Sequence, residues 1–330
     1  MEFVSLVRPA GAFQQPLRPD EVEAMCSRAF GAGTGVVSAV ELGGGMYNTV
    51  YRVTLAGRDR PVILRAAPVP ERQFRIERGL MRNEHAALPF LAPVSSLVPR
   101  TLTADFTREL AGRDYMFQEH LEGVPGGPEG MGMYPAELHG ALYRQLGEIA
   151  AAIHGVRGDR FGPVAGPWHV TWSGALSGYF VDLAADLDGV GLDSGDVRQV
   201  AEAVSRDRAV LDEVEVPRLL HGDLWTINVM LRPGAGEPTI CGVFDHDRAW
   251  WGDPEADWPL YMASRGPGGP QDAFWDGYGP RSSGKGAARR SLYYLARHAG
   301  AIRLERHRRG LADRVPQTYE QIAGVLALLG

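Results

Sequence analysis

The sequence has 330 residues, of which 45% are hydrophobic and 22% are charged, and this composition is ordinary for a globular protein with a full core. The length exceeds that of one typical domain and favours two lobes. The formal net charge of −6 argues against a nucleic-acid-binding protein. Residues 1–13 contain an acidic residue and no long apolar run, and no later stretch could span a bilayer, so we expect a cytoplasmic protein without a membrane partner.

Arginine supplies almost all of the positive charge, since Lys285 is the only lysine. A GC-rich bacterial genome accounts for such a bias. Basic residues cluster only near Arg303 to Arg309, where we expect a solvated helix face. The two cysteines, Cys26 and Cys241, are far apart and lack metal-ligand spacing, so we expect both to be reduced, structural thiols.

Residues 1–121 are predicted to form an N-terminal nucleotide-binding lobe that contains a β-sheet. Apolar residues recur at helical spacing in two segments, and runs rich in Val, Leu and Tyr predict strands. A glycine cluster splits the first of these runs and indicates a hairpin. The predicted helices cover 20–30 and 73–90, and the strands cover 36–53, 61–65 and 115–121.

Residues 122–330 are predicted to form a mostly helical lobe that carries the catalytic and substrate-binding groups. A glycine- and proline-rich stretch from Gly123 separates it from the first lobe and indicates a hinge. Its predicted helices cover 142–153, most of 183–214, and 290–309, and two short strands cover 229–231 and 240–244.

The stretch LLHGDLWTINVM, residues 219–230, places an asparagine five residues after an aspartate and directly before an apolar run. Phosphoryl transfer requires a carboxylate that deprotonates the attacking hydroxyl and oxygen ligands for Mg²⁺. We therefore predict Asp223 as the catalytic base and Asn228 as a metal ligand. Taken alone, the stretch is also compatible with a polar turn before a strand.

A second acidic residue, Asp245, follows the apolar residues Val243 and Phe244. In kinase-like enzymes a carboxylate at the end of such a strand binds the metal that bridges the nucleotide phosphates. We therefore predict Asp245 as a metal ligand. Asp247 lies two positions further on, where it could support the metal ligands from behind or face solvent in a turn, and we favour the solvent-facing turn.

The segments HGDLWTINVML and VFDHDRAWWGDPEADW together resemble the aminoglycoside phosphotransferase and choline kinase superfamily. The resemblance implies an α+β, bilobal protein-kinase-like fold, with an N-terminal antiparallel β-sheet lobe and a C-terminal mostly α-helical lobe. It also implies that His221 and Asp253 support the catalytic loops. Asp257 matches the acidic residue that follows Gly-Asp-Pro in this family.

The resemblance extends to the nucleotide site of the N-terminal lobe. Gly44, Gly45 and Asn48 belong to a glycine-rich turn that resembles the family's phosphate-covering loop, in which backbone N–H groups approach phosphate oxygens. Arg65 stands where the family normally has lysine, and we interpret this replacement as tolerated drift. Glu84 is its expected partner, with Glu77 as the rival.

Residues Gln118, Glu119 and Leu121 resemble the family's hinge, where backbone groups bind the purine edge. Backbone groups of Glu119 and Leu121 are expected to bind the base. The Gln118 amide could donate to the O6 of guanine. The donor is therefore expected to be ATP or GTP, with Mg²⁺ as cofactor.

The acceptor is expected to be a small molecule with a hydroxyl group. All seven tryptophans lie between residues 168 and 275, and aromatic faces beside an acidic cleft can stack on a sugar or base. We expect substrate contacts from Trp168, Trp172, Trp225 and Asp257, although packing of the helical lobe accounts equally for many tryptophans.

An antibiotic inactivated by phosphorylation is our leading acceptor. It would be of nucleoside or aminoglycoside type, and a capuramycin-like nucleoside is one example. A metabolite kinase acting on choline, homoserine or a sugar is the alternative within enzymes. A catalytically inactive nucleotide-binding protein is the alternative from another class, suggested by the missing lysine.

Overall fold

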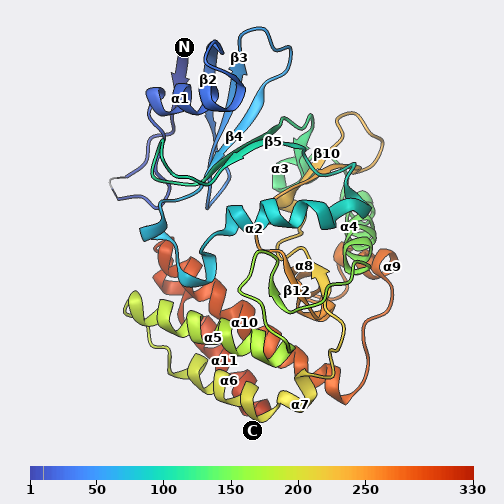
Figure 1. Ribbon diagram of the computed structural model, residues 1–330. Helices are drawn as coiled ribbons and strands as arrows, with labels where there is room; N and C mark the ends of the chain where they lie inside the picture. Colours follow the sequence, from blue (N-terminus) through green and yellow to red (C-terminus); the bar gives the residue numbers. More distant parts are fainter. Residues whose placement is uncertain (10) are drawn as a thin grey trace.

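The computed structural model describes residues 1–9 and 11–330, with a β-sheet at one end and a body of helices at the other (Figure 1). The sheet has six strands in the order β1-β2-β3-β4-β6-β5, and only the β1–β2 pair is parallel. The strands are β1 (Glu2–Val4), β2 (Val36–Leu42), β3 (Thr49–Leu55), β4 (Val62–Ala66), β5 (Thr101–Asp105) and β6 (Tyr115–Glu119).

Buried side chains alternate with more exposed ones along β3 and give this strand one apolar face. Tyr51, Val53 and Leu55 are buried on one face, together with side chains of helix α1 (Pro19–Phe30) that include Met25 and Cys26. Helix α1 therefore covers the face of the sheet that the apolar strand residues create. Cys26 is a free thiol, and Cys241 is also free, as predicted.

The single helix predicted over 73–90 is wrong in its extent. The structure contains the short 3₁₀ turns η1 (Pro70–Arg72) and η2 (Arg75–Glu77), then α2 (Leu80–Ala87) and the 3₁₀ segment η3 (Leu88–Val94). Gly79 has a φ of 71° and prevents a continuous helix from η2 into α2. Pro89 lies just after α2, where its missing N–H favours the change of helix type.

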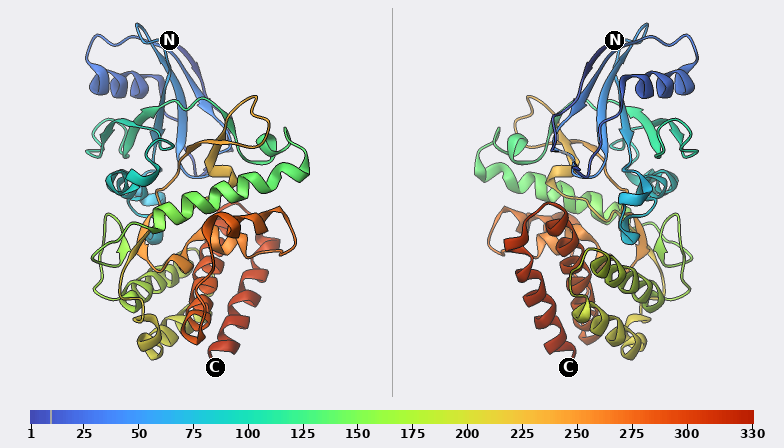
Figure 2. Two further views of the ribbon diagram at one scale, coloured as in Figure 1. Left: turned by 90° about the vertical axis from the view of Figure 1, so that its right-hand side faces the viewer. Right: turned by 90° about the vertical axis from the view of Figure 1, so that its left-hand side faces the viewer.

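The rest of the chain is mostly helical, as predicted. The helices α5, α6, α10 and α11 pack together at the C-terminal end, and α4 crosses between them and the sheet (Figures 1 and 2). No helix among residues 1–9 and 11–330 is long and apolar enough to cross a membrane. The helices are α3 (Pro128–Met131), α4 (His139–His154), α5 (Trp172–Gly189), α6 (Gly195–Arg206), α7 (Arg208–Leu211), α8 (Trp258–Ala263), α9 (Phe274–Tyr278), α10 (Lys285–Arg308) and α11 (Pro316–Leu329).

Two small sheets hold the loops of this second part in place. Strand β7 pairs with β10 and not with the large sheet. We therefore propose that the boundary between the two lobes lies after Leu121. The sheet orders are β11-β10-β7 and β8-β12-β9. The strands are β7 (Val124–Pro125), β8 (Gly162–Pro163), β9 (Arg218–Leu220), β10 (Val229–Leu231), β11 (Ile240–Val243) and β12 (Trp250–Gly252), and the remaining 3₁₀ turns are η4 (Ala136–Leu138), η5 (Thr226–Asn228), η6 (Pro254–Ala256), η7 (Pro270–Ala273) and η8 (Ala312–Arg314).

Trp172 lies in the core of the helical part, so its prediction as a substrate contact is wrong. Its side chain is 0% exposed, and its ring centroid lies 5.8 Å from that of Phe161 and 6.1 Å from that of Tyr294. The indole N–H donates a hydrogen bond of 2.9 Å to the Tyr294 hydroxyl. The prediction failed because a tryptophan at the start of a helix gives no local indication of which side it faces.

We expect Trp172→Ala to lower the free energy of unfolding by about 3–5 kcal/mol, because it removes a large side chain from a close-packed core. Denaturant unfolding followed by far-UV circular dichroism measures this loss. Trp168→Ala is the matched control, because Trp168 is 52% exposed and its loss is expected to cost less than about 1 kcal/mol. Equal losses in the two variants would contradict this assignment of Trp172 to the core.

Candidate active site

A cleft of about 1000 Å³ lies between the large sheet and the helical part. The glycine-rich loop between β2 and β3 and the hinge after β6 line one part of it. The loop after β9, the end of β11 and one face of α10 line the rest. Asp223, Asn228 and Asp245 therefore meet in one cleft with the glycine-rich loop, although up to 200 residues separate them in the sequence.

The turn that presents Asp223 depends on Gly222. This glycine has a φ of 84°, and a Cβ atom there would lie 2.1 Å from the carbonyl oxygen of Arg248. Both the backbone conformation and the space therefore require glycine. The chain leaves the core strand β9 at Leu220 and turns at once, so that Asp223 faces the cleft.

Asp257 anchors this turn, and its prediction as a substrate contact is wrong. Its carboxylate is 1% exposed and accepts hydrogen bonds from the backbone N–H groups of His221 at 2.9 Å and Gly222 at 2.7 Å. His154 Nε2 lies 2.9 Å from the same carboxylate. These bonds hold the pKa of Asp257 below its ordinary value against the effect of burial. A carboxylate with these partners is not free to bind a substrate.

The environment of Asp223 suits a general base. Burial raises the pKa of Asp223 to about 7, the charge of Arg248 opposes this rise, and the charge of Asp245 adds to it. A base with a pKa near neutrality accepts a proton readily, and about half of it is ionised at pH 7. The amide N–H of Asn228 donates to the Asp223 backbone carbonyl at 2.7 Å and fixes the turn.

The oxygen atoms near Asp245 fit a divalent ion. The Asn228 amide uses its nitrogen for the bond to Asp223, so its oxygen remains available as a ligand beside the Asp245 carboxylate. Within residues 1–9 and 11–330, no group of three or more His, Cys, Asp or Glu side chains is arranged to hold a metal ion. Mg²⁺ in nucleotide sites usually takes one or two carboxylates and completes its shell with phosphate and water oxygens. The donor set therefore fits Mg²⁺ with a nucleotide.

The prediction that Asp247 faces solvent is wrong. Its side chain is 3% exposed, and its backbone carbonyl accepts a hydrogen bond of 2.7 Å from the amide of Asn83. Burial and the neighbouring Asp245 charge raise the pKa of Asp247 well above its ordinary value. The charge of Asp245 thus disfavours a second ionised carboxyl at Asp247, and a bound cation would relieve this repulsion.

Arg65 joins three elements of the site. One terminal nitrogen of its guanidinium forms an ion pair with Glu84 of α2, and the other lies 2.6 Å from Asp245 Oδ1. The side chain is buried, and the two carboxylates compensate its charge. Glu84 therefore lies where the sequence predicted the partner of Arg65. Glu77, the rival, instead pairs with Arg308 of α10.

Gln118 lines the cleft, but its amide group contacts this ion pair. Its oxygen lies 3.5 Å from Arg65 Nη1, and its nitrogen lies 3.4 Å from Glu84 Oε1. In this arrangement the amide is oriented by two charged neighbours. These contacts do not support the prediction that the Gln118 amide donates to the O6 of guanine. We propose instead that Gln118 supports the Arg65–Glu84 pair.

The hinge and the glycine-rich loop present backbone groups to the cleft. The N–H of Glu119 donates to the Arg100 carbonyl at 2.9 Å, so only the carbonyl of Glu119 could contact a purine. Gly44 has a φ of 92°, and it lines the cleft together with Gly45, Asn48 and Leu121. The oxygen of the Asn48 amide is buried without a partner among the described residues, so this loop offers a polar atom to a ligand.

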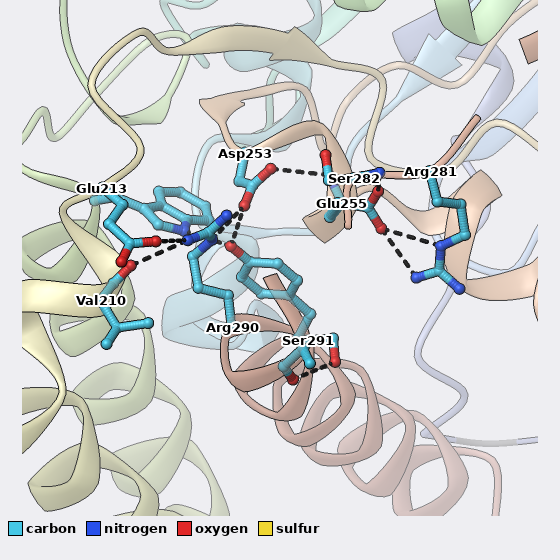
Figure 3. Close-up of polar contacts among 11 residues, drawn as sticks. Val210, Glu213, Asp253, Glu255, Arg281, Ser282, Arg290 and Ser291 are labelled. Atoms are coloured by element: carbon cyan, nitrogen blue, oxygen red, sulfur yellow. Dashed lines mark hydrogen bonds and ion pairs between the residues drawn. The ribbon is translucent and has the colours of Figure 1, made fainter. Parts of the chain in front are cut away.

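Asp253 is bound to side chains of α10, and Figure 3 shows its carboxylate beside Arg290. One oxygen of its carboxylate accepts from the Tyr294 hydroxyl at 2.6 Å and from Arg290 at 3.1 Å, and the other accepts from the N–H of Glu255 at 3.1 Å. Arg290 also forms an ion pair of 2.6 Å with Glu213. These contacts are those of a structural residue, and we propose that Asp253 supports the catalytic loops.

Helix α10 contributes residues to the site that the sequence did not reveal. The prediction of a solvated basic face at 303–309 is wrong for two of its arginines. Arg303 is 0% exposed and pairs with Asp196 at 2.6 Å, while Arg308 pairs with Glu77. Arg297 and Glu305 of the same helix line the cleft. Arginine that is bound by carboxylates from distant segments cannot be told from solvated arginine by local sequence.

Comparison with known proteins now identifies the family. A model of the phosphotransferase enzyme family matches residues 38–295. The chain belongs to the phosphotransferase enzyme family. The prediction of a phosphotransferase acting on hydroxyl groups is thereby confirmed at the level of the family, and the match begins in β2 and ends in α10. A comparison with curated proteins gives no match.

Solved structures show that this phosphotransferase has the kinase-like fold that the sequence predicted. Aminoglycoside phosphotransferase APH(4)-Ia is 18% identical with a TM-score of 0.63, covering 94% of this chain and 99% of that one. The GDP and kanamycin complex of APH(2″)-IIia is 17% identical with a TM-score of 0.61, covering 93% and 98%. A provisionally named fructosamine-3-kinase from Haemophilus somnus 129PT is 19% identical with a TM-score of 0.62, covering 92% and 96%.

The two remaining tryptophans predicted to contact the substrate of this phosphotransferase lie in different places. Trp225 lines the cleft beside Asp223. Trp168 lies outside the cleft, where the guanidinium of Arg160 stacks 4.2 Å from its ring centroid and its indole N–H donates to the Val164 carbonyl. The prediction for Trp168 is therefore wrong, and Trp225 remains a proposed substrate contact.

Arg65→Lys is expected to lower kcat/KM of the phosphotransferase by about 10- to 100-fold, since lysine has one nitrogen where Arg65 uses two. The loss corresponds to one charge-assisted hydrogen bond of about 1.5–3 kcal/mol. This expectation departs from our interpretation of Arg65 as tolerated drift. Steady-state kinetics check it, with Arg52→Lys on the exposed face of β3 as the control. Unchanged kinetics in Arg65→Lys would restore the drift interpretation.

Proposed function

We propose that the protein transfers the γ-phosphate of ATP or GTP to a hydroxyl group of a small molecule bound in the cleft. The observation that carries this proposal is the meeting of Asp223, Asn228 and Asp245 beside the glycine-rich loop. Asp223 would accept the proton of the attacking hydroxyl. Arg65 would orient Asp245 and contribute positive charge near the phosphates.

The nucleotide would lie between the glycine-rich loop and the hinge. The carbonyl of Glu119 and the N–H of Leu121 would contact the base, and Gly44, Gly45 and Asn48 would approach the phosphates. Mg²⁺, when bound to Asn228 and Asp245, would neutralise phosphate charge during the transfer. Because the Gln118 amide contacts the Arg65–Glu84 pair, it is not proposed to select guanine, and both ATP and GTP stay in the proposal as donors.

An antibiotic of nucleoside type remains our leading acceptor, with inactivation by phosphorylation as the result. Aromatic side chains on the acceptor side of the cleft support a flat acceptor, and they come from Tyr179, Trp225, Trp250 and Trp258. A metabolite kinase is the second candidate, because the same catalytic groups serve any small alcohol. The fold of the aminoglycoside enzymes and of the fructosamine-3-kinase is compatible with both.

A catalytically inactive nucleotide-binding protein is the proposal that the site supports least. Its motivation was the missing lysine, and Arg65 forms the ion pair with Glu84 that is expected of that lysine. The pKa of Asp223, raised to about 7, also suits a working base. A protein that only binds a nucleotide has no chemical use for such a base.

Asp223→Asn is expected to lower turnover at least about 100-fold, because the amide cannot accept the proton of the hydroxyl. Its affinity for ADP with Mg²⁺ is expected to change little, since Asp223 is not among the proposed nucleotide contacts. The acceptor is first found by screening antibiotics and metabolites for a phosphorylated product with ATP and with GTP. Calorimetric titration then measures ADP binding.

Asp59→Asn, in the exposed turn between β3 and β4, is the control for this variant. Full turnover by Asp223→Asn would show that another group is the base. Tight ADP binding without product from any acceptor in the wild-type protein would instead favour the inactive nucleotide-binding protein.

A further inference from the structure

One face of α10 forms a wall of the cleft beside the proposed base. The side chains on this wall recur at helical spacing, and the charges of Glu305 and of Arg248 both act on the Asp223 carboxyl. This places the wall where an acceptor hydroxyl would arrive. The cleft-lining side chains of α10 are those of Arg297, His298, Ala301, Ile302, Glu305 and Arg308.

The carboxylates along this wall already have cationic partners. Glu77 pairs with Arg308 and lies 3.4 Å from Arg248, and Glu305 lies 3.0 Å from Arg309. An acceptor that carries several ammonium groups would therefore have to displace arginines from these pairs. The wall offers such an acceptor little free negative charge.

Arg297 is the arginine of this wall that has no carboxylate. Among residues 1–9 and 11–330, its only hydrogen bond is from Nη1 to the Ala256 carbonyl at 3.3 Å, and its Nε is buried without a partner. The carboxylate of Asp257 acts on it from further away, but that group is held by His154 and by the turn at Gly222. Burial accordingly lowers the pKa of Arg297.

Two aromatic rings fix the position of this guanidinium. Its central carbon lies 4.7 Å from the ring centroid of Trp250 and 5.0 Å from that of Tyr179. The planes of the two rings lie at 81° to each other, and their contacts with the cation give its N–H groups no oxygen acceptor. Next to it, Nε2 of His298 is also buried without a partner. Polar groups without partners are costly, and beside a cleft they indicate a ligand group that is missing.

Lack of a carboxylate alone does not distinguish Arg297, because Arg113 also lacks one and also donates to a backbone carbonyl, that of Gln15 at 2.9 Å. Arg113, however, is not among the residues that line the cleft. The combination of a guanidinium without a carboxylate, two aromatic neighbours and a place on the acceptor wall is specific to Arg297 among the described residues.

We propose that the acceptor carries a carboxylate or a carboxamide, and that the Arg297 guanidinium binds its oxygen. Nη1 already donates to the Ala256 carbonyl and Nε is enclosed, so Nη2 is the nitrogen left to donate to that oxygen. The inference rests on the proposed function and narrows its acceptor to neutral or anionic molecules. It excludes polycationic aminoglycosides and choline, whose positive charge would face Arg297.

The test compares four sugars that differ only at C6: glucuronate, glucuronamide, glucose and 6-amino-6-deoxyglucose. Saturation-transfer NMR with ADP and Mg²⁺ present measures their affinities, and kanamycin is added as a polycation. We expect the wild-type protein to bind glucuronate or glucuronamide at least tenfold more tightly than glucose, and 6-amino-6-deoxyglucose and kanamycin more weakly still. The order of the acid and the amide tells which group is recognised. No advantage for either over glucose would overturn the proposal.

Arg297→Gln is expected to abolish this advantage and leave glucose binding within twofold. Its melting temperature is expected to stay level or rise, because the variant loses a partly buried charge that no carboxylate compensates, whereas loss of a purely structural arginine would lower it. If Arg297→Gln does not fold, Arg297→Lys replaces it, with the same loss of selectivity because the shorter side chain has no nitrogen at the position of Nη2. Arg160→Gln is the control, an arginine stacked on a tryptophan outside the cleft. An undiminished advantage in both Arg297 variants would refute the role of Arg297.

Phosphoryl transfer and ADP binding are measured on the same samples. A protein that selects the acid or amide through Arg297 but neither binds ADP nor forms product would contradict the proposed function and retain the binding site. A protein that forms product, but without this selectivity, would contradict only the proposal about Arg297.

Discussion

The ion pairs of Arg65 with Glu84 and Asp245 are the interaction on which the site depends. They connect β4 and α2, which belong to the sheet end of the molecule, with the segment after β11, which belongs to the helical end. A buried arginine between two carboxylates has a fixed geometry, because each of its terminal nitrogens has one partner. Arg65 therefore holds β4 and α2 in a defined position relative to Asp245, together with the bonds from Asn83 of α2 to the Asp247 and Ala249 carbonyls.

A second set of buried contacts orients the base. Asp257 accepts two backbone N–H groups of the turn, and Gly222 allows the chain to pass against the Arg248 carbonyl. These hydrogen bonds stabilise the ionised form of the Asp257 carboxyl in the folded protein, and its pKa is lowered accordingly. Asp223 behaves in the opposite way, since burial without comparable donors raises its pKa. Two aspartates in one region thus differ in role because they differ in partners.

The parts of this site that local sequence determines were predictable. Asp223, Asn228 and Asp245 each lie at the border of an apolar strand, so their spacing already indicated that they meet. The roles of Trp172, Asp247 and Asp257 were not predictable, because burial decides them and burial arises from segments far away in the chain. The broken helix at Gly79 shows the same limit on a smaller scale: apolar spacing continued through a residue whose φ is positive. The sequence did not predict the acceptor wall of α10, because the sequence around an arginine does not show whether its side chain is solvated or paired with a carboxylate from a distant segment.

Helix α10 has a consequence for how this protein could diverge. Its first half holds Asp253 through Arg290 and Tyr294, and its second half carries the acceptor wall from Arg297 to Arg308. The carboxylates that we propose for catalysis, Asp223 and Asp245, lie on other segments. Replacement of a few side chains on one face of one helix would therefore remodel the choice of acceptor while the chemistry stays intact. A family that shares its fold at less than 20% identity would gain new substrates most easily in this way.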